Sequence, residues 1–211
     1  MYFSQLKYGG VVMRIIWHGH ACFEIQSKEG IIVVDPYKDN SVPGLYMSTI
    51  KADLVLTSHG HSDHNAKDKV ELLNRDKDIK MTQIHSFHDD KQGSLRGNNI
   101  IHVIELEDMK VVHLGDLGCD IDEEILNDCD VLMIPIGGHY TIDAKMAKNL
   151  VDKIKPRIVI PMHYRGDTFG YEEISTLDEF KTLASDIIEY NSNVIEVDKN
   201  TKKQTVMLKI S

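Results

Sequence analysis

The sequence predicts a single α/β or α+β domain in which strands outnumber helices. Three observations support this prediction: the chain is 211 residues long, most of its apolar runs are only strand-sized, and two apolar stripes recur at helical spacing. No repeat, low-complexity segment or proline-rich linker divides the chain. We therefore expect one domain over 13–211, with residues 1–12 as an N-terminal extension before Met13.

The first half of the chain is rich in strand patterns. Apolar and β-branched runs predict strands over 14–17, 22–26, 31–34 and 53–57. Asp35 and Pro36 end the third of these, because proline cannot continue a hydrogen-bonded ladder. Val70 and Leu73 are three residues apart, which predicts a helix over 67–75.

The second half adds more strands and two amphipathic helices. Further strands are predicted over 81–84, 100–105, 110–114, 131–134, 157–160, 194–197 and 204–210. One helix is predicted before Pro156, from the apolar stripe Ala144, Ala147, Leu150, Val151 and Ile154. The other is predicted from the stripe Leu177, Phe180, Leu183, Ala184 and Ile187, opened by a capping box of Thr176 with Glu179.

Charge and cysteine content exclude several classes of protein. The 24 Lys and Arg against 33 Asp and Glu give a net charge of −9, which disfavours nucleic acid and anionic membranes as partners. No apolar run approaches the ~20 residues of a membrane span, and the N-terminal segment lacks the pattern of a secretory signal. Cys22, Cys119 and Cys129 contain no CxxC pair, which favours reduced thiols. We expect a cytoplasmic protein with a small-molecule substrate, either monomeric or a homo-oligomer.

The histidines of the segment after strand 53–57 are the first sign of chemistry. His59, His61, Asp63 and His64 follow this strand within six residues. In an extended segment, residues two apart point the same way, so His59 and His61 can chelate one ion while Asp63 and His64 face a second. Gly60 is expected to leave room for the bend. Imidazole nitrogen and carboxylate oxygen are donors that Zn²⁺ accepts.

Further donors stand where other predicted strands end. His85 and His88 follow strand 81–84, Asp116 follows strand 110–114, and His163 follows strand 157–160. Side chains at the carboxyl ends of strands converge on one crevice in open α/β sheets. These residues are therefore expected to complete a two-metal centre, with either His85 or His88 as a ligand.

Several motifs in this order resemble the metallo-β-lactamase superfamily. HGHSDH matches its HxHxDH signature, and SFHDD, HLGD and PMH follow at similar spacing. WHGHACFEI, VVDPY, GDLG, PIGGHYTID and IKPRIVIPMHY further resemble small single-domain bacterial and archaeal metal-dependent hydrolases of β-lactamase fold, which are related to ascorbate-phosphate lactonases. The resemblance covers Met13 to the C terminus. It implies a four-layer αββα sandwich, with two mixed sheets face to face and helices outside.

The resemblance also implies a ligand set and a reaction. It assigns His59, His61 and His88 to the first metal, Asp63, His64 and His163 to the second, and Asp116 as the bridge, and it selects His88 over His85. The expected cofactors are two Zn²⁺, with Mn²⁺, Fe²⁺ or Ni²⁺ as substitutes. The ions would turn a shared water into hydroxide that attacks a small ester, lactone or phosphodiester. Asp63 would orient that hydroxide or take its proton, and the excess positive charge would favour anionic substrates.

Other polar residues are expected to support this centre or line the substrate pocket: His20, Asp35, His139, Tyr140 and Thr141. Asp35 would hold a ligand through a hydrogen bond. His113 is expected to be a hydrogen-bonded interior histidine, and His102 a strand-surface residue. Two alternatives remain: an RNA or DNA phosphodiesterase of the same superfamily, and a metal-binding or sensing protein without turnover.

Overall fold

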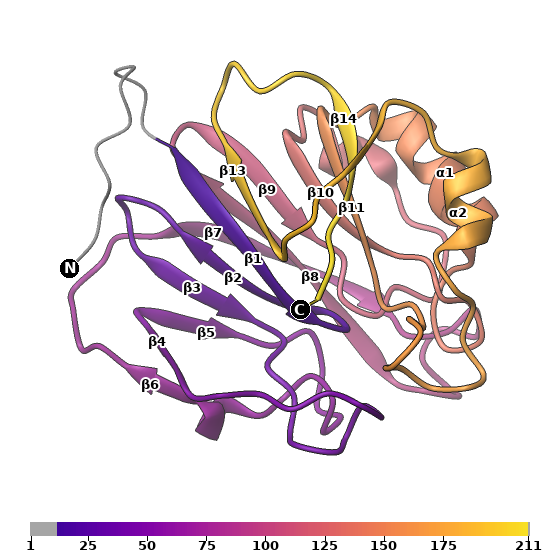
Figure 1. Cartoon of the computed structure of the whole chain (residues 1–211), viewed down its shortest axis with the longest axis horizontal. Coiled ribbons are helices and arrows are strands. Elements are labelled where there is room, and N and C mark those ends of the chain that lie inside the picture. Colours follow the sequence, from indigo (N-terminus) through magenta and orange to yellow (C-terminus); the bar gives the residue numbers. More distant parts are fainter. Residues whose placement is uncertain (1–11, 211) are drawn as a thin grey trace.

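Two β-sheets pack face to face in the computed structural model, which describes residues 12–210 (Figure 1). The five-stranded sheet contains, in spatial order, β13 (Val194–Val197), β1 (Met13–Gly19), β2 (Cys22–Gln26), β3 (Ile31–Val34) and β5 (Leu54–Leu56). Its strands are antiparallel except for the parallel pair β3 and β5, so the sheet is mixed. The predicted extension over 1–12 lies, up to residue 11, outside the described residues.

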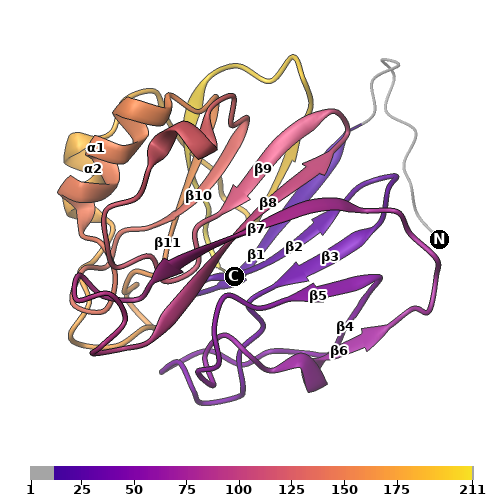
Figure 2. The same ribbon diagram turned by 180° about the vertical axis from the view of Figure 1, so that it is seen from behind.

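The second sheet has seven strands and is also mixed. Its spatial order is β12 (Ile187–Glu189), β14 (Gln204–Met207), β11 (Ile158–Met162), β10 (Val131–Pro135), β9 (Met109–His113), β8 (Asn98–Leu106) and β7 (Lys80–Phe87). The strands from β12 to β9 are parallel, and β8 and β7 are antiparallel to their neighbours. Helices α1 (Ala144–Ile154) and α2 (Asp178–Leu183) lie outside this sheet (Figures 1 and 2). The predicted sandwich of two mixed sheets is confirmed.

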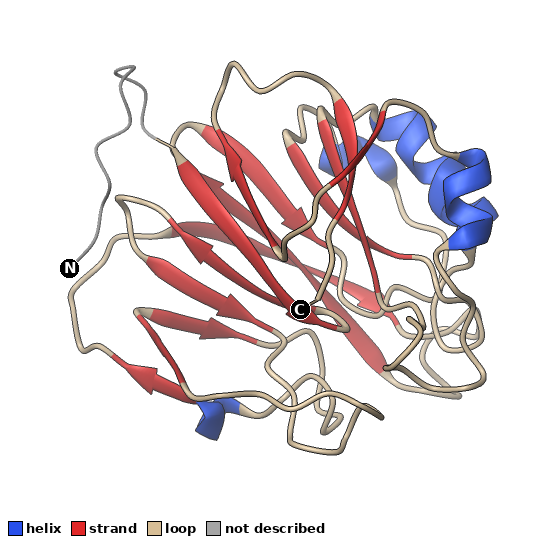
Figure 3. Cartoon of the chain, in the orientation of Figure 1, coloured by secondary structure: helices blue, strands red, loops and turns tan. Residues whose placement is uncertain are grey.

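The outer side of the five-stranded sheet is covered differently. A small parallel sheet of β4 (Ile50–Ala52) and β6 (Val70–Leu72) lies there with the 3₁₀ turn η1 (Lys67–Lys69), whereas both α-helices are on the other side of the molecule (Figure 3). A second 3₁₀ turn, η2 (Glu123–Leu126), precedes β10. Tyr37, Val42, Leu45 and Met47 pack against Val33 of the sheet. In the described part of the chain, loop side chains and short strands therefore replace an outer α-helical layer on this side.

Burial of side chains explains why these strands form. In β1, Met13, Ile15 and Trp17 are buried while Arg14 is exposed, the two-residue alternation of a strand with one face in the core. All five residues of β10 are buried, because this central strand is covered by the other sheet on one face and by α1 on the other. The predicted α1 is confirmed, and its backbone leaves the helix at Lys155, in the left-handed region, just before Pro156.

Three predictions about helices are wrong. Residues 67–75 do not form a helix: after η1, β6 pairs with β4, because β-branched Val70 is buried opposite Ile50 and the ladder satisfies the backbone. The second helix ends at Leu183 rather than at 187, because Ile187 begins β12 and pairs with β14. The capping box is absent, since Thr176 donates to Asp178 instead and Leu177 is the N-cap residue.

No helix in residues 12–210 has the length and apolar character required to cross a membrane.

Candidate metal centre

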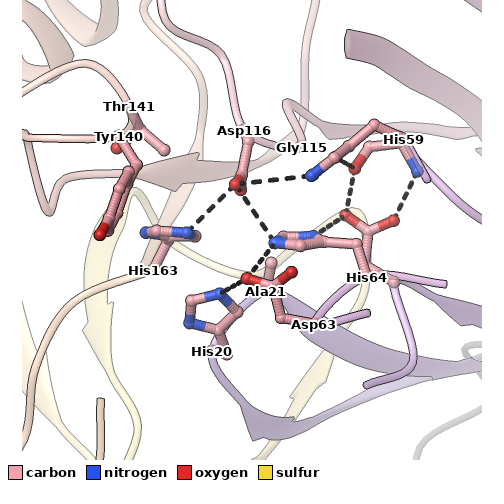
Figure 4. Close-up of polar contacts among 12 residues, drawn as sticks. His20, Ala21, His59, Asp63, His64, Gly115, Asp116, Tyr140, Thr141 and His163 are labelled. Atoms are coloured by element: carbon pink, nitrogen blue, oxygen red, sulfur yellow. Dashed lines mark hydrogen bonds and ion pairs between the residues drawn. The ribbon is translucent and has the colours of Figure 1, made fainter. Parts of the chain in front are cut away.

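Histidines and carboxylates from both sheets meet at one place, where several strands end (Figure 4). In the five-stranded sheet, β5 leads into the loop that carries His59, His61, Asp63 and His64. In the seven-stranded sheet, His88 directly follows β7, Asp116 follows β9, and His163 directly follows β11. The carboxyl ends of strands therefore position the candidate ligands, as the sequence predicts.

Asp116 lies at the middle of this group. Its Oδ2 atom is 3.1 Å from His88 Nε2, 3.2 Å from both His64 Nε2 and His163 Nε2, and 3.9 Å from His59 Nε2. The Asp116 backbone N–H donates to Asn99 Oδ1 at 2.9 Å, which holds the carboxylate in place. One carboxylate is thus surrounded by four imidazole nitrogens.

The remaining donors divide into two sets, and one histidine from each, His59 and His64, forms a third group with Asp116. The ligand atoms within each set lie within 4.8 Å of one another: His59, His61 and His88 in one, and His20, Asp63, His64 and His163 in the other. Several of these atoms are buried without a hydrogen-bond partner in the described structure, including His59 Nε2, His64 Nε2 and Asp116 Oδ1. Buried polar atoms normally have partners, so converging unpaired donors of this chemistry fit bound cations.

A buried network around Asp35 fixes the imidazoles of His59 and His64. Asp35 Oδ2 accepts from His64 Nδ1 at 2.9 Å and from Ser58 Oγ at 2.6 Å, so Ser58 Oγ can accept from His59 Nδ1 at 2.9 Å. Both rings are therefore held with Nδ1 in this network and with Nε2 directed at the centre. The prediction that Asp35 supports a ligand through a hydrogen bond agrees with this geometry.

His88 is oriented in the same way by the backbone. A carbonyl oxygen can only accept, so His88 Nδ1 donates to the Tyr140 carbonyl at 3.0 Å and leaves Nε2 for the centre. His85, the alternative ligand, is an exposed residue of the edge strand β7, and it belongs to none of the candidate ligand groups found among the described residues. The structure thus brings His88, and not His85, to the other donors.

Three buried residues of the centre have an unusual backbone conformation. His20, Asp35 and His163 have φ values of 52°, 50° and 52°, in the left-handed region that non-glycine residues rarely adopt. The surrounding contacts hold them there: the His20 carbonyl accepts from the His163 N–H at 3.1 Å and from the Trp17 indole at 3.0 Å. Such conformations cost roughly 1–3 kcal/mol each and cluster at functional sites.

The carboxylates of the centre are ionised. Burial would raise the pKa of Asp35, but the charge and hydrogen bond of His64 lower it to about 2. Burial likewise opposes ionisation of Asp116, yet the charges of His163 and His64 hold its pKa well below the usual value. The contacts of Asp63 with His20 and His64 lower its pKa against the effect of burial. The centre therefore provides anionic oxygen donors at neutral pH.

The histidines differ among themselves. Burial and the charge of His64 lower the pKa of His59 to about 3, and burial and His163 lower that of His20 to about 4. For His64 and His88, burial acts in the same direction, but the charge and hydrogen bond of Asp116 outweigh it and raise the pKa. The electrostatics thus depend on Asp116 at the centre.

The residues predicted to support the centre or line its pocket are placed unequally. The ring of His20 lies 4.0 Å from that of His163, centroid to centroid, and its Nε2 is 3.4 Å from Asp63 Oδ2. Tyr140 reaches the centre through its carbonyl, whereas His139 is exposed and packs edge-on against the Tyr140 ring. Thr141 lies in the same turn, where its hydroxyl donates to the Ile142 carbonyl.

Two interior histidines lie near the centre but outside it. His113 is buried, and its Nε2 donates to the Ala21 carbonyl at 2.9 Å, as the sequence predicts. The prediction that His102 is a surface residue is wrong: its side chain is fully buried. β8 lies between β7 and β9, and His102 is the cross-strand neighbour of the buried His113. Residues 101–104 of β8 are all buried, so an alternation of buried and exposed residues does not apply there.

Sequence reasoning missed three supporting residues: Ser58, Asn99 and Tyr171. Tyr171 Oη lies 3.2 Å from Asp63 Oδ2 and 2.5 Å from the Ser41 carbonyl, so its one proton can go to either acceptor. Asn99 also donates to Ser86 Oγ and the Leu114 carbonyl. Ser58 could have been found from its place beside His59, but the contacts of Asn99 and Tyr171 span distant segments and left no local signal.

Comparisons with known proteins agree with this architecture. Residues 14–163 match the β-lactamase superfamily domain. A UPF0173 metal-dependent hydrolase of Thermoplasma acidophilum is 33% identical, over 84% of this chain and 93% of that protein, and one of Thermoplasma volcanium is 31% identical, over 84% and 94%. A Thermotoga maritima crystal structure assigned to the metallo-β-lactamase superfamily has a TM-score of 0.71 at 30% identity, over 93% of this chain and 98% of that one.

A more distant structure shows the same fold. Igni18, a metallo hydrolase of Ignicoccus hospitalis, has a TM-score of 0.67 at 19% identity, over 89% of this chain and 99% of that one. The domain match, the relatives and the shared sandwich lead to one conclusion: this chain belongs to the metallo-β-lactamase superfamily.

Proposed function

We propose that this protein is a zinc-dependent hydrolase that acts on a small ester, lactone or phosphodiester at a two-metal centre. The observation that carries the proposal is the convergence of buried, unpaired donor atoms around Asp116. It is supported by relatives that are named metal-dependent hydrolases. His59, His61 and His88 would hold one ion, Asp63, His64 and His163 the other, and Asp116 would bridge them. Their role as ligands stays a prediction.

When bound there, two zinc ions supply Lewis acidity, which activates a water molecule and polarises a carbonyl or phosphoryl oxygen. The chain's own residues supply orientation. Asp35, Ser58 and the Tyr140 carbonyl fix the Nδ1 protons of three histidines, so each presents only Nε2. Because ligand orientation is set before metal arrives, little rearrangement is needed on binding.

Asp63 is the residue we assign to proton transfer. The Asp63 carboxylate is ionised at neutral pH, so it can accept a hydrogen bond or a proton from the attacking water. Tyr171 lies within hydrogen-bond distance of Asp63 Oδ2 and limits the directions in which this carboxylate can turn. His20 Nε2 lies 3.4 Å from the same oxygen atom, and the His20 ring packs edge-on against that of Tyr171.

Asp116→Ala tests the bridging assignment. We expect wild-type protein to bind two zinc ions per chain by elemental analysis, and Asp116→Ala to lose stoichiometric metal and all hydrolysis. Asp68→Ala, an exposed carboxylate of η1, is the matched control and should retain both. Two ions retained by Asp116→Ala would contradict the assignment.

The substrate class is tested by a panel of lactones, phosphodiesters and thioesters on zinc-loaded protein, read beside Asp63→Asn. Asp63→Asn removes the proton acceptor and is expected to lower kcat by 10²-fold or more, the usual contribution of general base catalysis.

A cytoplasmic location is part of the same proposal, because the three free cysteines suit a reducing compartment.

A further inference from the structure

Arg96 is a half-buried cation beside the candidate metal centre. Its guanidinium carbon lies over the Tyr140 ring, 5.5 Å from the ring centroid. Among residues 12–210, the structure gives its guanidinium no carboxylate or carbonyl partner. A guanidinium whose face rests on an aromatic ring still has its N–H donors at the edge, arranged as a planar fork that fits an oxyanion. Arg96 is therefore held in place with its donors available.

The loop that carries Arg96 is built around a buried carboxylate. Asp89 is only 2% exposed, and its two oxygen atoms accept backbone N–H groups at 2.7–3.0 Å from Lys91, Gly93, Leu95 and Arg96. The loop closes on the centre, because His88 N–H donates to the Gly97 carbonyl at 3.1 Å. Asp89 is not among the candidate ligands, so its role here is to fix the backbone that presents Arg96.

Tyr140 connects this loop to both halves of the centre. Its carbonyl accepts from His88 Nδ1, and its ring lies 5.8 Å from that of Tyr171, which in turn lies against Asp63. The surface on which Arg96 rests is thus continuous with the residues that orient His88 and Asp63. A substrate whose scissile group sits at the centre can extend along Tyr140 towards Arg96.

We propose that Arg96 binds an anionic group of the substrate, a carboxylate or phosphate separate from the scissile bond, and so selects negatively charged esters, lactones or phosphodiesters. This inference rests on the proposed hydrolase function and deepens it. The oxyanion would accept two parallel N–H bonds from the guanidinium, the strongest form of charge-assisted hydrogen bonding. In a chain with net charge −9, such a cation beside the centre also offsets the repulsion of anionic ligands.

Two matched esters test the proposal: 4-nitrophenyl valerate, which is neutral, and mono-4-nitrophenyl glutarate, which ends in a carboxylate. The variants are Arg96→Met, which keeps an unbranched side chain without the charge, and Arg96→Lys, which keeps the charge without the planar set of guanidinium donors. Lys145→Met is the control, because it removes one exposed cation from α1. Binding of inorganic phosphate to each zinc-loaded protein, measured by calorimetry, gives a readout besides activity.

We expect Arg96→Met to lower kcat/KM for the glutarate ester about 10- to 100-fold, mainly by raising KM. For the valerate ester, kcat/KM should change less than about twofold. Arg96→Lys should be intermediate, phosphate should bind more weakly to both variants, and Lys145→Met should match wild type. An unchanged charge preference and unchanged phosphate affinity in Arg96→Met would overturn the role of Arg96 alone. If wild type cleaves neither ester and binds no zinc, the hydrolase proposal fails, and phosphate affinity, then measured without zinc, still decides whether Arg96 is an anion site.

Discussion

Asp35 is one buried side chain on which two candidate ligands depend. Its two oxygen atoms accept from the Ser58 N–H, the Ser58 hydroxyl and His64 Nδ1, and its pKa of about 2 keeps both as acceptors throughout the neutral range. The residue also occupies the left-handed backbone region, at φ 50°. The hydrogen bonds that orient His59 and His64 therefore depend on a residue with an unfavourable backbone conformation.

We expect Asp35→Asn to weaken zinc binding about 10- to 100-fold, the usual effect of losing a hydrogen-bond partner of a metal ligand. The amide has one acceptor oxygen where the carboxylate has two, so its NH₂ group faces an N–H or O–H donor of Ser58 or His64. His64 can respond by moving its proton from Nδ1 to Nε2, which removes the lone pair that would bind metal. Zinc affinity by chelator competition measures this. Asp68→Asn, exposed on η1, is the control, and equal affinities for wild type and Asp35→Asn would refute the mechanism.

The three thiols are expected to differ in reactivity. Cys22 and Cys129 are buried, and burial together with the charge of Asp130 raises the pKa of Cys129 to about 12, whereas Cys119 is partly exposed. Because the thiolate is the reactive form, native protein at pH 8 should show one slowly reacting thiol with a disulfide reagent, and three after denaturation. Cys119→Ala should leave none in the native state. Fast reaction of two or more native thiols would mean that the interior is open.

At the level of elements, the segment after β9 packs closely against the end of β7. A Cβ atom on Gly118 would come within 2.5 Å of the His88 carbonyl carbon and 2.6 Å of the Asp89 nitrogen. Gly60, inside the HGHSDH motif, is the opposite case: a Cβ there would meet no atom within 4 Å, and its backbone does not adopt a positive φ. The expectation that Gly60 makes room for the bend therefore has no steric support.

These two glycines give a matched prediction. Gly118→Ala should displace the backbone of His88, lower the free energy of unfolding by about 1–3 kcal/mol and weaken zinc binding. Gly60→Ala should change the free energy of unfolding by less than about 0.5 kcal/mol and leave zinc affinity unchanged. Urea denaturation and chelator competition measure both effects. The reverse ranking would show that the motif glycine, and not the packing at Gly118, determines the shape of the centre.

Strands were easier to predict than helices for a physical reason. Buried strands such as β10 are continuous apolar runs, and α1 shows five apolar residues at helical spacing. In both cases the sequence pattern directly indicates which residues are buried. The pattern over 67–75 rested on only two apolar residues, and pairing with β4 determined the outcome. The candidate ligands were recognisable because donors follow strands, but Asn99 and Tyr171 act through contacts that the chain makes only when folded.

For the whole molecule, the centre joins the two sheets of the sandwich. His59, His61, Asp63 and His64 follow a strand of the five-stranded sheet, whereas His88, Asp116 and His163 follow strands of the seven-stranded one. A ligand that binds only the folded state stabilises it by about 4 kcal/mol when its free concentration is 1,000 times its Kd. Bound metal should therefore stabilise the packing of one sheet on the other.

Removal of metal is expected to lower the melting temperature of wild-type protein, and added zinc to restore it. Calorimetric melting of chelator-treated and reloaded protein measures the difference. Asp116→Ala should have the same melting temperature with or without zinc, because the variant lacks the carboxylate that we propose bridges the two metal positions. A wild-type protein whose melting temperature is insensitive to chelator would show that the sheets pack independently of metal.

The contact between the His20 carbonyl and the His163 amide has a consequence for biosynthesis. It joins the first hairpin to a strand end far along the chain, so a nascent polypeptide emerging from the ribosome cannot assemble the centre until β11 has left the exit tunnel. Until then, the early histidines are exposed to cellular metal without their later partners. The full set of candidate ligands is therefore brought together only late in synthesis, after the segment that carries His163 has emerged.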